Sequence, residues 1–264
     1  MKILQKNTGS GGLLLVHVAG LTNKGMERPR NEDSFFFKVE SDIALLVVAD
    51  GMGGHRAGNV ASGLAVSAAE NFWADLDRST QLSAEETNRL IKCLILDANE
   101  LILGEAGSSA EQQGMGTTLT VGLLCGSRLT IGHIGDSRAY LINNGQIRLL
   151  TRDHSLLEEL IQNGQVKPEE AKNHPQRHVL TRALGIASDL QVDVTEQEIE
   201  AGSVLLFCTD GLTNLVSEDE ILAASSGQPE PGLLAESLID LANSRGGFDN
   251  ITVVVATGIG GPQT

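Results

Sequence analysis

Six carboxylates in this sequence stand at the ends of apolar runs, which suggests that they share a site. Asp50 directly follows the run Ile43–Ala49, which has the length and the β-branched content of a buried strand. The other five lie within two residues of similar runs; they are Glu32, Asp33, Asp136, Asp210 and Asp249. In an antiparallel sheet the end of one strand and the start of its neighbour share an edge. We therefore expect all six carboxylates to meet at one edge.

Converging carboxylates favour a site for divalent cations. They repel one another, and burial raises the free energy of keeping them ionised. Cations relieve that repulsion, and ligation by oxygen alone points to a hard ion such as Mg²⁺ or Mn²⁺. Two such ions about 3.5–4 Å apart can share a carboxylate, activate a bridging water and neutralise a phosphoryl group. Asp50 is our candidate for the shared ligand, because the carbonyl of Gly51 can reach the second ion.

Each of these pieces alone has a simpler interpretation. Asp-Gly is the commonest turn dipeptide, so Asp50-Gly51 and Asp210-Gly211 also suit plain turns. Arg28 lies just before the first acids and can grip phosphate oxygens with its forked guanidinium, or it can be a surface arginine in a basic pair with Arg30. His55 can act as a general acid, or it can hydrogen-bond the backbone of its own loop.

The glycine-rich stretch 51–58 does not match a nucleotide-binding loop. Counted from Gly51, GxG is met, but Arg56 stands in place of the third glycine of a dinucleotide fingerprint. A Walker-type GK[ST], a GxSxG nucleophile motif and a zinc-binding HExxH are all absent from the sequence. These absences argue against nucleotide cradling, a serine nucleophile and a zinc protease.

Composition limits the class of protein and its partners. The chain has 264 residues, 41% of them hydrophobic and 20% charged, which is ordinary for a globular protein with a full core. A net charge of −15 argues against nucleic acid and anionic lipid as partners. No apolar run approaches the roughly 18 residues of a membrane span, and the N-terminus lacks a signal-peptide pattern. The three cysteines form no CxxC, so we expect reduced thiols and a cytoplasmic protein.

Closely spaced strand patterns predict mainly antiparallel sheet, with a hairpin signal at Asn143-Asn144-Gly145. Helical patterns fall in an early and a late block, so we expect helices on both outer faces of two stacked sheets, in one domain over residues 1–264. The expected strands are Leu13–Ala19, Ser34–Val39, Ile43–Ala49, Thr118–Cys125, Leu129–Ile134, Arg138–Asn143, Gln146–Leu150, Ser203–Cys208 and Ile251–Ala256. The expected helices are Val60–Asp75, a segment running from the capping box at Ser83 to Ile102, Ser217–Ala224 and Gly232–Ala242.

The segment from Asp153 to Ala187 has a different character. It is polar, contains two prolines and carries only short helical patterns, at Leu156–Gln162 and Pro168–Lys172. We interpret it as an insertion over the surface, and such segments often cover a site.

Taken together, these motifs resemble the metal-dependent protein phosphatases (the PPM or PP2C-type serine/threonine phosphatases), and in particular their compact bacterial branch. The resemblance runs from about residue 20 to about residue 257, and the ordered set of motifs is far more specific than any one of them. The matching stretches are GLTNKGMERPRNEDSF (20–35), VVADGMGGHRAGNVAS (47–62), GMGTTL (114–119), IGDSRAYL (134–141), LTRDHS (150–155), HPQRHVLTRALG (174–185), CTDGLTNLV (208–216) and GGFDNITVVV (246–255).

The resemblance implies a role for each matching residue. Asp50 is similar to the bridging metal ligand, Gly51 to the carbonyl ligand of the second ion, and Asp210 and Asp249 to the remaining ligands of the first. Asp136 resembles the ligand of a third, weaker ion. The implied supporting roles are phosphate binding by Arg28, contact with the centre mostly through water by Glu32 and Asp33, and substrate choice by a flap at about 153–187.

Two departures from the family pattern stand near the site. Animal members place a histidine directly after the Asp-Gly pair, and this chain has Met52 there. His55 lies three residues further on, as in bacterial members, so its role as general acid stays open. Asn59 stands where many bacterial relatives carry Glu. Neither change touches an expected metal ligand.

The resemblance also implies a fold and an activity. The implied fold is a four-layer α-β-β-α sandwich, and the implied reaction is hydrolysis of phosphoserine and phosphothreonine on proteins by a metal-bridging hydroxide at a binuclear Mn²⁺ or Mg²⁺ centre. Two alternatives stay open: an enzyme specialised for one small phosphoprotein, and a pseudophosphatase that only binds. We expect a monomer whose substrates come from a cognate serine/threonine kinase.

Overall fold

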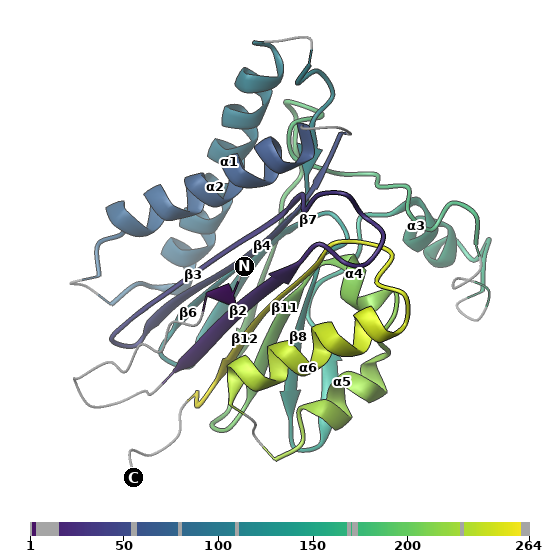
Figure 1. Ribbon diagram of the computed structural model, residues 1–264. Coiled ribbons are helices and arrows are strands. Elements are labelled where there is room, and N and C mark those ends of the chain that lie inside the picture. Colours follow the sequence, from purple (N-terminus) through teal and green to yellow (C-terminus); the bar gives the residue numbers. More distant parts are fainter. Residues whose placement is uncertain are drawn as a thin grey trace.

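The computed structural model describes residues 2–3, 16–53, 57–78, 81–108, 111–167, 170, 174–227 and 230–259. Two antiparallel sheets pack face to face, and helices cover the outer face of each (Figure 1). One sheet has the strand order β1-β2-β12-β11-β8-β9, and the other has the order β10-β7-β6-β4-β3 with β5 paired to β4. This is the expected α-β-β-α sandwich.

The strands are β1 (Lys2–Ile3), β2 (His17–Asn23), β3 (Asp33–Glu40), β4 (Ile43–Met52), β5 (Gly116–Thr117), β6 (Leu119–Cys125), β7 (Arg128–Ile134), β8 (Arg138–Asn143), β9 (Gln146–Leu149), β10 (Asp193–Glu198), β11 (Val204–Cys208) and β12 (Ile251–Thr257). The helices are α1 (Ala57–Asp75), α2 (Ala84–Ala106), α3 (Leu156–Gln162), α4 (Asp210–Thr213), α5 (Glu218–Ala224) and α6 (Pro231–Ser244). Among the helices of the described ranges, none combines the length and the apolar character that a membrane crossing requires.

Strand β4 shows why the central strands appear in the sequence as unbroken apolar runs. Successive side chains of a strand point to opposite faces of the sheet. Leu45 and Val47 pack with α1 and α2 in one core, whereas Leu46 and Val48 pack in the core between the two sheets. Both faces of the strand are therefore buried, and a register slip of one residue would exchange the two sets.

The structure differs from the expected elements in a few places. Strand β4 continues through Asp50 to Met52, where β5 pairs with it, so Asp50 lies inside a strand and not after one. Asp210 opens the short helix α4, which the pattern did not indicate. Strand β10 was missed, and residues 13–15 and most of the expected piece Pro168–Lys172 lie outside the described residues.

Candidate metal centre

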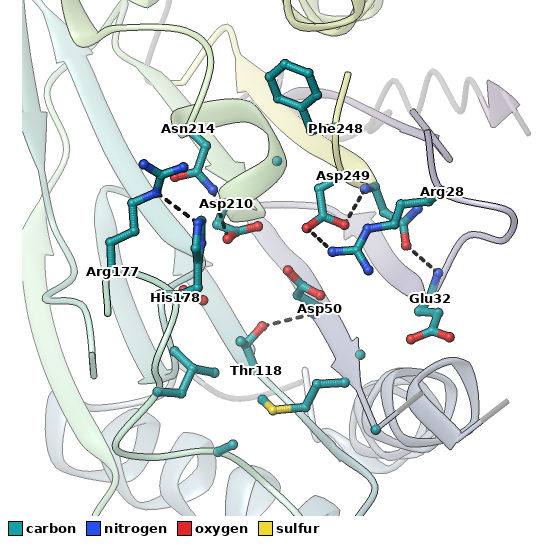
Figure 2. A pocket seen from close by; sticks show the side chains of 18 of the residues that line it. Arg28, Glu32, Asp50, Thr118, Arg177, His178, Asp210, Asn214, Phe248 and Asp249 are labelled. Atoms are coloured by element: carbon teal, nitrogen blue, oxygen red, sulfur yellow. Dashed lines mark hydrogen bonds and ion pairs between the residues drawn. The ribbon is translucent and has the colours of Figure 1, made fainter. Parts of the chain in front are cut away.

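A pocket of about 1340 Å³ opens at the edge where the two sheets meet, and five of the six acids line it. Figure 2 shows the carboxylates of Asp50, Asp210 and Asp249 turned toward one space, with Arg28 beside them. Asp136 and Glu32 also line the pocket, and Asp33 is buried beneath it at 8% exposure. The expectation from the sequence that the acids gather at one edge therefore agrees with the structure.

Strand pairing brings these acids together from distant parts of the chain. Asp50 in β4 stands directly opposite Asp33, the first residue of β3. Asp210 follows β11, and Asp249 precedes its antiparallel neighbour β12, so the two acids share an edge. Asp136 lies in the connection from β7 to β8, where the chain passes from one sheet to the other.

The backbone at Asp50 is held by two threonines. Its N–H donates to Thr118 Oγ1 at 2.9 Å, and its carbonyl accepts from Thr118 N at 2.9 Å and from Thr117 Oγ1 at 2.8 Å. Thr117 and Thr118 belong to the stretch GMGTTL (114–119) quoted above. In the structure they fix the residue that carries the central carboxylate.

Asp33 is anchored by hydroxyl groups from the other sheet. Its Oδ2 accepts from Thr209 Oγ1 at 2.9 Å and from Thr252 Oγ1 at 2.7 Å. Its second oxygen, Oδ1, is buried and has no hydrogen-bond partner in the described part of the protein. The same is true of Oδ1 of Asp210, whose other oxygen accepts from Asn214 Nδ2 at 3.0 Å. A buried acceptor without a donor calls for a cation or a proton.

The acids raise one another's pKa values. Burial is the main cause for each, and neighbouring carboxylates add to it. The pKa of Asp136 rises to about 8 by burial and by the charge of Asp210, and that of Asp33 rises to about 7 by burial. Burial and the charge of Asp33 lift the pKa of Asp50 well above its ordinary value, and burial and Asp249 raise that of Asp210. Such a cluster is unfavourable when ionised and attracts cations.

These donors fit Mg²⁺ or Mn²⁺, because they are carboxylate oxygens with open lone pairs around one cavity. In the described ranges, however, no three carboxylate, imidazole or thiolate groups are close enough to form a finished set of ligands. Asp249 is instead paired with Arg28, whose Nη2 donates to Asp249 Oδ2 at 2.8 Å (Figure 2). With side chains 55% and 34% exposed, this ion pair is weak, so Asp249 can exchange it for a metal at small cost.

Asn250 organises the loop that carries Arg28. Its Oδ1 accepts from Glu32 N at 2.7 Å, and its Nδ2 donates to the carbonyls of Lys24 and Arg30 at 2.9 and 2.8 Å. The Glu32 carbonyl in turn accepts from Gly51 N at 3.2 Å. The backbone of Glu32 thus joins the loop of Arg28 to β4, and the contact of Glu32 and Asp33 with the metal centre through water stays a prediction.

The segment expected to form a flap has an outer part and an inner part. Helix α3 has no buried residue, whereas residues 180–183 and Ile186 line the pocket. The inner part is tied to the body of the protein: Thr117 and Leu184 exchange backbone hydrogen bonds, and Asn99 on α2 binds Gly185 N at 2.8 Å and the carbonyl of Ala187 at 2.9 Å. The wall of the pocket is thus held in place.

His154 joins this wall to the loop of Asp136. The backbone N–H of His154 donates to the Gly135 carbonyl at 2.7 Å, and Gly135 N donates to His154 Nδ1 at 3.1 Å. Its carbonyl accepts from Thr181 N at 2.8 Å. Because Nδ1 is an acceptor, the ring proton is on Nε2, 3.1 Å from Asp193 Oδ2. This buried imidazole therefore holds the peptide next to Asp136.

Comparison with known proteins decides the family. A family model described as protein phosphatase 2C matches residues 27–231. The serine/threonine phosphatase Stp of Listeria monocytogenes is 39% identical over 241 residues, which are 91% of this chain and 95% of that protein. The chain belongs to the protein phosphatase 2C family. The phosphatase PstP of Mycobacterium tuberculosis is 39% identical over 92% of this chain and 45% of its own length.

Solved structures of protein phosphatase 2C relatives have the same architecture. The crystal structure of M. tuberculosis PstP superposes with a TM-score of 0.83 at 38% identity and covers 92% of this chain and 98% of that one. The catalytic domain of PstP in complex with two manganese ions superposes with a TM-score of 0.81 at 36% identity, over 93% and 99%. The family and the fold that we expected from the sequence are confirmed.

Within this protein phosphatase 2C chain, the structure places the expected site residues as follows. Asp50, Gly51, Asp136, Asp210, Asp249 and Arg28 all line the pocket. His55 lies outside the described residues. Sequence reasoning missed the partners that hold these groups, namely Thr209, Thr252, Asn214, Asn250 and His154; all five fall inside the quoted motifs, but none has a spacing that singles it out.

Proposed function

We propose that this protein hydrolyses phosphoserine and phosphothreonine on proteins and requires two Mn²⁺ or Mg²⁺ ions. The observation that carries the proposal is the pocket in which Asp50, Asp210 and Asp249 face one another beside Arg28. The relatives named as serine/threonine phosphatases, and the relative that holds two manganese ions, support it.

The metal ligands in this proposal are Asp50, the carbonyl of Gly51, Asp210 and Asp249, with Asp136 at a third, weaker ion. Bound ions would neutralise phosphoryl charge and lower the pKa of an attacking water. Arg28 stands at the rim with a guanidinium that can take two phosphoryl oxygens once it leaves Asp249. Asp33, locked by two threonine hydroxyls, keeps the floor of the site rigid.

The proposed setting follows from the substrate and from the thiols. The substrates would be phosphoproteins made by a cognate serine/threonine kinase, and the enzyme would act as a monomer. Cys93, Cys125 and Cys208 are free thiols, as suits the cytoplasm.

The test is hydrolysis of an aryl phosphate and of a phosphothreonine peptide with Mn²⁺ and with EDTA. We expect turnover that depends on Mn²⁺ and is lost in Asp50→Ala and Asp210→Ala by at least about a hundredfold, with the fold kept. The exposed Asp97→Asn on α2 serves as the matched control. Full activity in Asp210→Ala would contradict the ligand assignment, and absence of hydrolysis by the wild type would favour a pseudophosphatase that only binds.

A further inference from the structure

Exposed large apolar side chains occur at the pocket and next to it: Phe248 and Ile186 line it, and Met26 and Val179 lie close to lining residues in the sequence. Six such side chains occur among the described residues, and four of them belong to segments that form its rim. Met26 is 66% exposed, Phe248 54%, Ile186 58% and Val179 46%. Single exposed apolar residues are normal on a protein surface, but a group beside a pocket marks a binding surface.

The pair Met26 and Phe248 is held rigidly on one side of the site. Met26 N donates to the Gly247 carbonyl at 2.8 Å, which joins the two loops. Gly246 and Gly247 both have positive φ, and a Cβ at Gly246 would come within 2.5 Å of the Phe248 ring. The ring therefore lies against bare backbone. Phe248 directly precedes Asp249, and Figure 2 shows its ring above that carboxylate.

Ile186 belongs to the wall formed by the inner part of the flap segment, and Val179 lies just before that part in the chain. Ile186 lines the pocket, and Val179 lies between the lining residues His178 and Leu180. The hydrogen bonds of Asn99 and Thr117 hold this wall on the body of the protein. Apolar groups are thus fixed on two separate walls of one charged cavity.

We propose that these four residues bind large apolar side chains that flank the phosphorylated residue of the substrate. In an extended segment, alternate side chains point the same way. When the phosphorylated side chain enters the pocket, those two positions before and after it face the rim, each about 7 Å away along the chain. We therefore assign the preference to these two positions. The inference rests on the proposed function and specifies its substrate class.

A phosphoprotein segment fits this surface better than a membrane or a second copy of the chain. Both of the latter need one continuous apolar face, whereas here Arg28, Asp249 and the other charged groups separate the two apolar walls. The net charge of −15 also opposes an anionic bilayer. The apolar groups are continuous with the cavity where the phosphoryl group would bind.

The experiment compares two phosphothreonine peptides that differ only at the second residue on each side, Leu in one and Ser in the other. Initial rates with Mn²⁺ give kcat/KM for each. We expect wild type to favour the Leu peptide by about tenfold, the factor for burying roughly half of such a side chain. Phe248→Ser and Ile186→Ser should each reduce this ratio severalfold. Leu233→Ser on α6, at a side chain 62% exposed, should leave the ratio and the basal activity unchanged.

The ratio of two peptides on one enzyme preparation does not depend on how much of a variant folds. Equal kcat/KM values for both peptides on an active wild type would overturn this inference and leave the proposed function standing. No hydrolysis of either peptide or of an aryl phosphate would instead refute the proposed function. A wild-type dimer in sedimentation that Phe248→Ser dissociates, with an unchanged ratio, would assign the surface to self-association and also overturn the inference.

Discussion

Replacing Asp136 by Asn should stabilise the metal-free protein at neutral pH, although it removes an expected metal ligand. Burial, together with the charge of Asp210, raises the pKa of Asp136 from 3.8 to about 8. Folding therefore takes up a proton at this group. An asparagine has the same shape, carries no charge and does not need that proton. The variant therefore avoids the loss of folding free energy that the buried carboxyl group causes in wild type.

Proton linkage gives the direction in which the raised pKa of Asp136 changes the free energy of unfolding with pH. Because the pKa is higher in the folded than in the unfolded state, the cost is absent below about pH 4, grows as the pH rises, and is complete above about pH 8. At pH 7 the solution is about 3 pH units above the ordinary pKa, which at about 1.4 kcal/mol per unit gives about 4 kcal/mol. Since Asp136 lines an open pocket, water screens part of this free energy. We therefore expect Asp136→Asn to raise the free energy of unfolding by about 2 kcal/mol.

The assay is thermal unfolding in EDTA between pH 5 and pH 8. We expect Asp136→Asn to melt roughly 4–8 °C above wild type at pH 7 and much closer to it at pH 5. Saturating Mn²⁺ should shrink or reverse the difference, because wild type gains more from binding. The control is Asp97→Asn, an exposed acid on α2. A variant whose melting temperature in EDTA at pH 7 is equal to or below that of wild type would refute the idea that repulsion among these acids destabilises the metal-free protein.

Three further outcomes test the surroundings of the site. Arg28→Ala should raise KM for an aryl phosphate with little change in melting temperature, because its ion pair with Asp249 is exposed; an unchanged KM would return Arg28 to an ordinary surface role. Asn250→Ala should cost about 2–4 kcal/mol in urea unfolding, since three hydrogen bonds to the loop of Arg28 are lost, and a loss below about 0.5 kcal/mol would count against this role. Asn99→Ala should loosen the wall at Gly185 and raise KM for a phosphopeptide more than for an aryl phosphate; equal changes for both substrates would speak against a positioning role.

Much of the fold was predictable because its strands carry strong local signals. Both faces of β4 are buried, so its whole run is apolar and stands out in the sequence. The Asn144-Gly145 turn between β8 and β9 also follows local chemistry, with positive φ at both residues. Strand β10 has the sequence DVTEQE and lies at the edge of its sheet, largely exposed, so no apolar pattern marks it. Its pairing with β7 makes it a strand.

The sequence by itself determined which acids could form the site, because an acid next to a buried apolar run must lie at the edge of a sheet. Only the tertiary structure decided how they are held. Asp33 meets Thr209 and Thr252 across 176 and 219 residues of chain, and no local pattern reports a contact between two sheets. Likewise, Met26 and Phe248 are brought together by two loops from opposite ends of the chain, which are joined where Met26 N donates to the Gly247 carbonyl. Spacing along a chain encodes local geometry, whereas contacts between distant segments arise from packing of the whole.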